Sequence, residues 1–149
     1  HLNLGLALLE VGEVEEAQDN FRDALRHAVG SGSPTAESVA CGNLARSAKL
    51  AGDVDTARAC LDRYLRLTNS LKDSNGEADA YHQLGGLALD QGDLRDAGAQ
   101  FENALYLSGT LVEPEQQEQH VGTKIQLGMA QGAHAFDDWM AGAMAEIIP

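Results

Sequence analysis

One pattern recurs three times in this chain at an interval of forty residues. The three copies read GEVEEAQDNFRDAL at 12–25, GDVDTARACLDRYL at 52–65 and GDLRDAGAQFENAL at 92–105. Each copy begins with a glycine and an acidic residue. Apolar residues then follow at steps of three and four, which is the spacing of one helix face. Each copy therefore predicts a turn followed by an amphipathic helix.

A second helical pattern lies directly before each glycine, again in register. It reads NLGLALLEVG at 3–12, NLARSAKLAG at 43–52 and QLGGLALDQG at 83–92. The third residue of each segment is Gly or Ala, and a small residue there allows a partner helix to pack closely. Each repeat is thus expected to be a helix, a tight turn at the glycine, and a second helix.

Helix pairs at a fixed period bury their apolar faces only against neighbouring pairs, which predicts an all-α solenoid of stacked antiparallel helix pairs. The repeats are expected at 1–32 (truncated at its start), 33–72, 73–112 and, in degenerate form, 113–149. The helices are expected at 2–11, 14–29, 34–50, 54–71, 75–91, 94–110, 114–131 and 136–147. His1 already lies inside an apolar periodic run, so the chain is expected to be a piece of a longer protein.

The segments between repeats also carry helix-start signals. Ser33 is a fitting N-cap and Pro34 a fitting first-turn residue, while Ser74 and Glu77 have the spacing of a capping box. In the last segment the Gln-Leu-Gly motif returns, and Gly132 stands forty residues after Gly92. The residues after Gly132 lack the earlier Ala and Phe pattern. We therefore expect a degenerate final repeat or capping helices, with a break between 131 and 136.

The paired motifs resemble the tetratricopeptide repeat (TPR). That repeat has Leu-Gly in its first helix, then a turn. Its second helix carries an Ala, then a Phe or Leu, and finally Ala-Leu. The usual period is 34 residues, and forty-residue spacing resembles the arrays of the LGN/Pins family. The segment LTNSLKDSNGEADAYHQLG at 67–85 is also similar to the inter-repeat segment of that family. The resemblance implies a non-catalytic scaffold that binds a protein or peptide and needs no cofactor.

Composition narrows the partner class. The chain of 149 residues has 23 acidic and 10 basic residues and a net charge of −13. An acidic surface repels phosphate, so nucleic acid and anionic membranes are poor partners. No apolar run approaches the roughly 20 residues that span a membrane. Two cysteines do not make a disulfide scaffold, and a reducing, cytoplasmic setting is expected.

The Leu-Gly or Leu-Ala motif of each repeated segment is preceded by a carboxamide: Asn3, Asn43, Gln83 and Gln126. A carboxamide both donates and accepts hydrogen bonds, so a regular ladder of them could bind the backbone of an extended peptide. In LGN-like arrays, Asn residues at the matching place contact bound peptide. The alternative is that these amides only tie neighbouring helices together.

Arg46 and Lys49 lie one turn further along the same helix face as Asn43. They belong to the only stretch that is not acidic, residues 31–68, and could bind an acidic side chain or a C-terminal carboxylate. They could also be two solvated surface charges. His82 precedes Gln83 and could contribute to the same groove, although a lone histidine is more often structural.

Other chemistry is not expected. Cys41 falls where Tyr81 falls one repeat later, which predicts a buried packing position, and Cys60 is similar. The five histidines are scattered, so no metal site is expected. GSGS at 30–33 lacks the Lys-Ser/Thr of a phosphate loop. No nucleophile, base and orienting group fall together, so an enzyme is not expected.

Three cellular settings fit this sequence. The first is a scaffold within a larger complex, as in ciliary and axonemal proteins with long-helix TPR arrays. The second is the sensor domain of a bacterial transcription regulator, because such proteins carry similar acidic, Ala/Gly-rich TPR arrays. The third is an LGN-like signalling adaptor.

Overall fold

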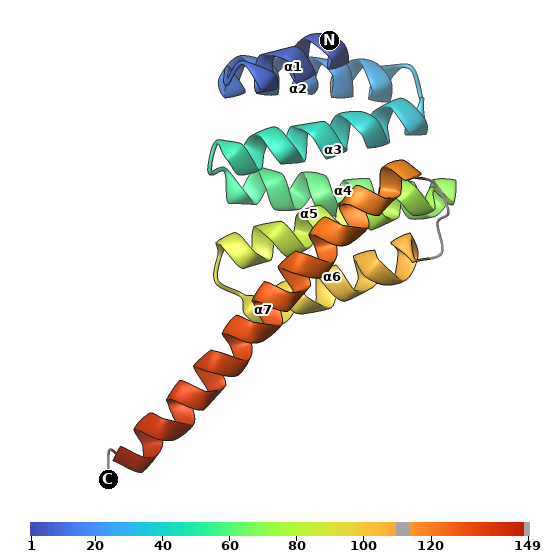
Figure 1. The fold of residues 1–149 in the computed structure, drawn as a ribbon. Helices are drawn as coiled ribbons and strands as arrows, with labels where there is room; N and C mark the ends of the chain where they lie inside the picture. The colour runs from blue at the N-terminus through green and yellow to red at the C-terminus, as the bar shows by residue number, and fades with distance from the viewer. Residues whose placement is uncertain (110–113, 148–149) are drawn as a thin grey trace.

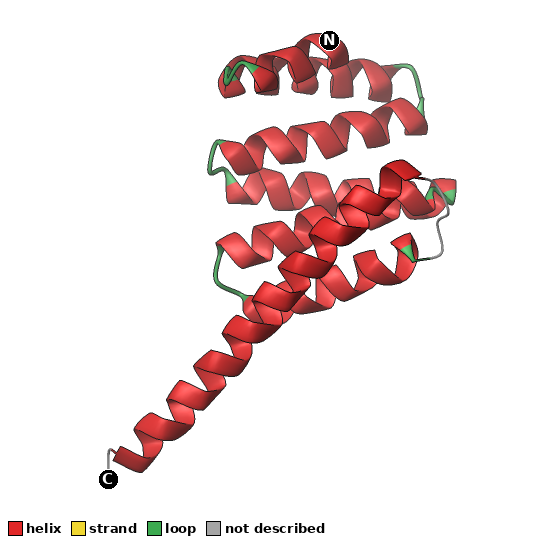
Figure 2. Cartoon of the chain, in the orientation of Figure 1, coloured by secondary structure: helices red, strands yellow, loops and turns green. Residues whose placement is uncertain are grey.

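The computed structural model describes residues 1–109 and 114–147, and within the last helix it describes the side chains of Thr123 and of residues 125–142. All regular structure in these residues is helical (Figure 2). The helices are α1 (Leu2–Glu10), α2 (Val14–Gly30), α3 (Pro34–Leu50), α4 (Val54–Leu71), α5 (Ser74–Asp90), α6 (Leu94–Ser108) and α7 (Pro114–Ile147). The predicted all-α solenoid is confirmed.

The helices stack in chain order, each packing against the one before it and the one after it (Figure 1). The odd-numbered helices also approach one another directly, α1 to α3, α3 to α5 and α5 to α7. The described even-numbered helices show no such approach to one another. The odd-numbered helices therefore form the inner, more crowded layer of a curved solenoid, as expected for stacked helix pairs.

The turns inside the repeats form where the sequence predicts them. Gly52 and Gly92 both have φ of 77°, a left-handed conformation that glycine adopts without steric cost. The acid after each glycine then caps the next helix. Asp53 Oδ1 accepts a hydrogen bond from the backbone N–H of Thr56 at 3.1 Å, and Asp93 accepts the matching bond from Asp96. Turn and cap together end one helix and start the next.

The segment between the second and third repeats is capped differently from the prediction. Asp73, not Ser74, is the N-cap of α5, and its Oδ1 accepts a hydrogen bond from the N–H of Gly76 at 3.0 Å. Ser74 is the first helical residue, so the predicted capping box of Ser74 and Glu77 is wrong. An aspartate one position earlier supplies an equally good acceptor and is charged, which favours it at the positive end of the helix.

The predicted break in the last segment is also wrong, because α7 runs without interruption from Pro114 to Ile147. Gly132 lies inside this helix and lacks the positive φ of the turn glycines. Its successor is Ala133, where the earlier turns have an acid. Alanine is the best helix former and cannot cap, so nothing at this point favours a new start over continuation. The eighth helix is therefore absent from the described chain.

The core is made of small residues and a few large ones. Phe21 and Phe101 are fully buried, Leu61 is nearly so, and alanines fill much of the remaining core. The predicted burial of Cys41 is confirmed, and burial raises the pKa of its thiol to about 11. Cys60 is half-buried, and burial raises the pKa of its thiol as well. Both cysteines are free and serve as packing residues.

Candidate partner-binding site

The four predicted amides lie one on each inner helix. Asn3 is on α1, Asn43 on α3, Gln83 on α5 and Gln126 on α7. The forty-residue period puts the first three at the same turn of successive helices. Asn3 is exposed and Asn43 is half-buried. The ladder therefore follows the inner layer of the solenoid.

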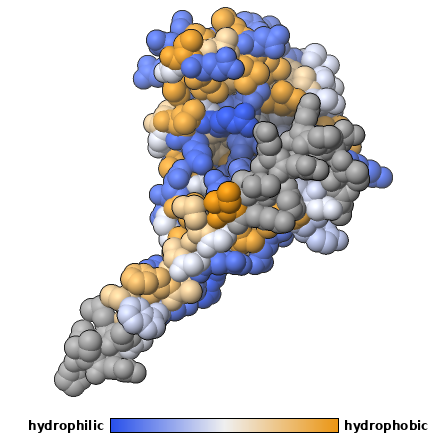
Figure 3. Space-filling view, in the orientation of Figure 1, coloured by the Kyte–Doolittle hydropathy of each residue, from blue (hydrophilic) through white to orange (hydrophobic). Residues whose placement is uncertain are grey.

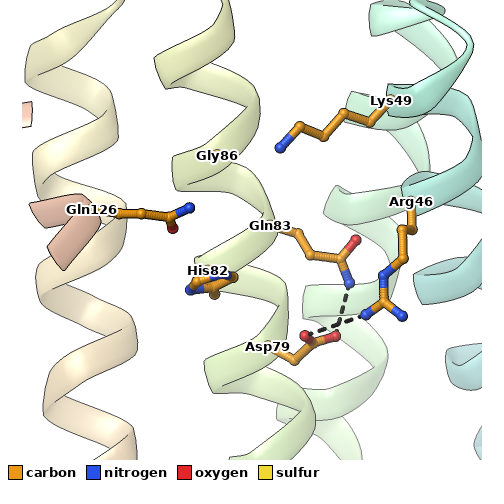
Figure 4. Close-up of a pocket in the computed structure, with 7 residues that line it drawn as sticks. All are labelled: Arg46, Lys49, Asp79, His82, Gln83, Gly86 and Gln126. Carbon is orange, nitrogen blue, oxygen red and sulfur yellow. Dashed lines mark hydrogen bonds and ion pairs between the residues drawn. The ribbon is translucent and has the colours of Figure 1, made fainter. Parts of the chain in front are cut away.

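A pocket of about 290 Å³ opens on this inner layer between α3, α5 and α7. In Figure 3 the same face is hollowed beside α7, and the atoms around the hollow are hydrophilic. Five of the seven predicted site residues line the pocket, together with two that the sequence did not single out (Figure 4): Arg46, Lys49, His82, Gln83 and Gln126, joined by Asp79 and Gly86. Asn3 and Asn43 are not among the lining residues.

Asp79 organises one side of the pocket. Its Oδ2 accepts a hydrogen bond from Gln83 Nε2 at 2.8 Å and another from the Tyr64 hydroxyl at 3.2 Å. Its Oδ1 lies 3.8 Å from Nη2 of Arg46 (Figure 4). Burial, and then the negative charge of Asp79, raise the pKa of Tyr64, so its hydroxyl stays a donor. Asp79 thus fixes Gln83 and lies near Arg46. Its position four residues before Gln83 is a sequence signal that the two share one face of a helix.

Arg46 remains available to a ligand despite this contact. Its side chain is 50% exposed, and the 3.8 Å separation from Asp79 is long for an ion pair. Partly exposed ion pairs of this kind contribute about 0–1 kcal/mol. A carboxylate that offers a shorter, two-pronged contact can therefore displace Asp79 from the guanidinium at little cost.

Lys49, which lies one turn after Arg46 on α3, also lines the pocket. Its Nζ lies 3.4 Å from Asp90 Oδ2. A Cβ added to Gly86 would come within 2.7 Å of the same Nζ. The absence of a side chain at Gly86 therefore leaves the space in which the lysine head group lies. Gly86 is a functional candidate that a periodicity argument cannot find, because it is helical and has no unusual φ.

His82 ties the inner helices together. Its Nδ1 lies 2.7 Å from the Thr123 hydroxyl on α7, and its ring packs edge-on against Phe101 with the centroids 5.8 Å apart. Burial lowers the pKa of His82. The negative charge of Asp79 opposes this shift, and the positive charges of Lys49 and Arg46 lower the pKa further. The imidazole is therefore neutral at pH 7. These contacts agree with the structural alternative for this residue, although it still lines the pocket.

Gln126 contributes an unsatisfied acceptor. Its Oε1 is buried and has no hydrogen-bond partner among the described residues. A buried polar atom without a partner costs about 1–3 kcal/mol, so a ligand N–H that reaches it gains correspondingly. The pocket thus offers two cationic donors, Arg46 and Lys49, and the amide of Gln126, whose Oε1 becomes accessible to a ligand when the side chain turns. That combination suits a peptide segment, which supplies acceptor oxygens and N–H donors together.

Sequence comparison agrees with the helix pairs seen here. Two sequence models described as tetratricopeptide repeat match the chain, one at residues 1–23 and 38–63 and the other at 78–110. The chain belongs to the tetratricopeptide repeat family. The predicted resemblance to the tetratricopeptide repeat is therefore confirmed, and the finer resemblance to LGN/Pins arrays stays a prediction. A specific similarity to ciliary TPR proteins is not shown.

A solved structure shares the fold. The crystal structure of BtubC (BKLC) from P. vanneervenii superimposes with a TM-score of 0.82 at 22% sequence identity. The alignment covers 90% of this chain and 55% of the BtubC chain, so the present TPR chain spans little more than half of that protein's length. At this identity the likeness shows the fold alone. A comparison with curated proteins gives no match.

The TPR family is typically a non-catalytic scaffold for protein–protein interaction. No helix in the described part of this TPR chain is long and apolar enough to cross a membrane. Within the same residues, no group of three or more His, Cys, Asp or Glu side chains is placed to hold a metal ion.

Proposed function

We propose that this TPR array holds an extended segment of a partner protein along its inner layer, with the pocket between α3, α5 and α7 as the anchoring site. The observation that carries the proposal is convergence. Arg46 and Lys49 from α3, Gln83 from α5 and Gln126 from α7 all line one cavity. Three separate helices contribute to this cavity, as expected for a binding groove in an array whose repeats are otherwise packing units.

The chemistry of the pocket defines the ligand. Arg46 and Lys49 would bind an acidic side chain or a C-terminal carboxylate, and the amides would bind the peptide backbone. Packed helices lie about 8–10 Å apart, and an extended chain advances about 3.3 Å per residue. Successive inner helices therefore meet roughly every third ligand residue. Gln126 Oε1 would accept a hydrogen bond from one backbone N–H of that segment.

The charge of the array limits the ligand further. The net charge of −13 repels a uniformly anionic segment, whereas Arg46 and Lys49 attract a single acid. The partner segment should therefore carry one or two acids within a mixed or basic sequence. Its acids give orientation, and its backbone gives most of the contact.

The cellular setting is a finer proposal. We favour a scaffold within a larger cytoplasmic assembly, of which a ciliary or axonemal complex is one instance. The sensor domain of a bacterial regulator and an LGN-like adaptor are the alternatives. All three use a TPR array to bind protein, and they differ in what accompanies the array. A helix-turn-helix or a phosphate loop in the same polypeptide would favour the regulator.

Capture of the partner tests the site. Immobilised TPR chain would be exposed to an extract of its source cell, and the retained proteins would be identified by mass spectrometry. The Arg46→Glu variant should lose the partner, because the new charge repels the ligand acid in a partly enclosed groove. Its matched control is Arg58→Glu, which makes the same charge change on α4, where Arg58 pairs with Asp96 at 3.7 Å.

The two variants separate the possible interfaces. Loss with Arg46→Glu and retention with Arg58→Glu support the inner groove. The reverse result would place the interface on the outer layer. The protein would then act as an assembly subunit that does not bind peptides in its groove.

A further inference from the structure

The second half of α7 presents an apolar face that nothing in the described chain covers. Figure 1 shows this part of the helix leaving the stack and running clear of α1–α6. The large apolar residues exposed along α7 are Ile125 and Met129 in its first half and Phe136, Trp139 and Met140 in its second half. At about 100° per residue, these positions fall within one third of the helix circumference. We call them the apolar face of α7.

One acidic residue lies beside this face. Asp137 follows Phe136 directly, is exposed, and has no ion-pair partner among the described residues. Asp138 lies on the opposite side of the helix, 3.0 Å from His134. The projecting part of α7 is therefore an apolar stripe with negative charge beside it. Phe136 and Trp139 are 59% and 65% exposed, which is unusual for large aromatic side chains.

A surface of opposite character lies on the outer layer, between α2 and α4. A hollow of about 480 Å³ there is lined by Arg22, Leu25, Arg26, Val29, Gly30 and Arg63. Leu25 and Val29 make its apolar floor, and Val29 is 50% exposed. We call it the arginine-rimmed hollow. Three of the ten basic residues of a strongly acidic chain gather around it.

Two of the three arginines at the rim are only weakly engaged. Arg22 pairs with Asp19 at 3.1 Å and Arg26 with Asp23 at 2.8 Å, each within one helix turn. Exposed pairs of this kind contribute about 0–1 kcal/mol each, so they give way readily to a partner carboxylate. Arg63 is held more firmly, because both its Nε and its Nη2 contact Glu37 of α3, whose side chain is only 14% exposed.

We propose that the apolar face of α7 from one copy docks into the arginine-rimmed hollow of a second copy. Phe136 and Trp139 would cover the floor formed by Leu25 and Val29, and Asp137 would face the rim arginines. Charge complementarity selects this occupant, since α7 offers Asp137 beside its apolar face and the hollow offers arginines around an apolar floor.

The contact must form between molecules. Figure 1 places α2 at one end of the stack and the projecting part of α7 at the other. One molecule therefore cannot fill its own hollow. Because the two docking surfaces differ, the association is heterologous and adds copies head to tail. It uses none of the residues that line the pocket between α3, α5 and α7, so the array could associate while its inner groove stays free.

Trp139 makes the proposal directly measurable. It is the only tryptophan in the chain, so intrinsic fluorescence reports on this one position. Sedimentation velocity and emission spectra of the chain would be recorded at increasing concentrations up to about 1 mM, where even weak contacts become populated. We expect species larger than a monomer and a blue shift of emission that rise together.

Two charge reversals identify the surfaces. Arg26→Glu and Asp137→Arg should each raise the concentration of half-association by about tenfold or more, because each places like charges across the contact. Mixing the two variants should restore association, since a positive α7 face then meets a negative hollow. Arg58→Glu, on α4 but not among the residues lining the hollow, should leave association unchanged.

Three results would overturn the proposal. One is a monomer throughout the concentration range. Another is association that neither reversal affects, because this would indicate that two apolar faces of α7 pack symmetrically. The third is failure of the mixed variants to associate although each variant has the helical circular dichroism of the parent chain.

Discussion

Gly85 on α5 faces the ring of Phe101 on α6 so closely that a Cβ at Gly85 would lie 2.6 Å from Cε1 of Phe101. Gly5 and Phe21 stand in the same relation two repeats earlier, in the first repeat. The second repeat has Ala45 and Leu61 at these positions instead. A larger residue on the first helix is thus matched by a smaller one on the second, which keeps the distance between paired helices constant.

This relation predicts that Gly85→Ala lowers the free energy of unfolding by roughly 1–2 kcal/mol, since overpacking outweighs the helix propensity gained. In a Phe101→Leu background the same change should become stabilising, as the Ala45 and Leu61 pair implies. Gly98→Ala is the control, because a Cβ there meets nothing within 4 Å, and it should stabilise the protein by about 0.5–1 kcal/mol. Urea unfolding of the double-mutant cycle measures the coupling. Additive effects would contradict the account.

Ala57 gives a second test of helix spacing. It is fully buried in the cluster that joins α3, α4 and α5, so Ala57→Leu should overpack this cluster and cost roughly 1–3 kcal/mol. Ala59→Leu on the exposed side of the same helix should change stability by less than about 0.5 kcal/mol. Thermal unfolding compares the two. Equal melting temperatures for Ala57→Leu and the parent chain would place Ala57 on the surface.

The continuous α7 can be tested by a distance. Spin labels at residues 125 and 142, in a chain without Cys41 and Cys60, should be about 26 Å apart along the helix axis. Ala133→Asp restores the glycine–acid pair of the other turns and should shift part of the population to shorter distances, because it offers a new N-cap. A short distance in the parent chain would show a helix–turn–helix there.

His82 predicts a pH dependence of stability. Burial lowers the pKa of the folded imidazole below the ordinary value near 6.5, so the unfolded chain takes up a proton first as pH falls. The contribution of His82 to stability is therefore full above about pH 6.5 and is lost as pH falls toward the folded pKa. Between pH 7 and 5.5 the parent chain should lose stability more steeply than His82→Gln. Parallel slopes would show that His82 titrates alike in both states.

Local signals were enough to predict most of the fold. Gly52 and Asp53 end one helix and cap the next through groups that lie side by side in the sequence, and the same holds at Gly92 and Asp93. The six helices from α1 to α6 begin and end within two residues of the prediction. The prediction fails at 132–135 because Gly132 has the expected spacing but is followed by Ala133, which cannot cap a new helix.

The site was less accessible to sequence reasoning because its parts meet only in three dimensions. The amides could be found, since Gln83 and Gln126 repeat a position in the motif. Asp79 could not be identified as the organising residue, because Arg46 and Tyr64 reach it from other helices. The role of Gly86 depends likewise on where Lys49 extends its side chain. Periodicity identifies a helix face, and tertiary packing decides which side chains on it meet.

The central claim is that the inner groove binds a partner segment, and site-specific photo-crosslinking tests this claim most directly. A photoreactive amino acid would replace Gln83 in the pocket or, as the control, Arg58 on α4, and crosslinked peptides would be mapped by mass spectrometry. We predict that the probe at position 83 labels one short partner segment that contains an acidic residue, and that the probe at position 58 does not label it. Labelling of the partner from position 58 alone would contradict the account.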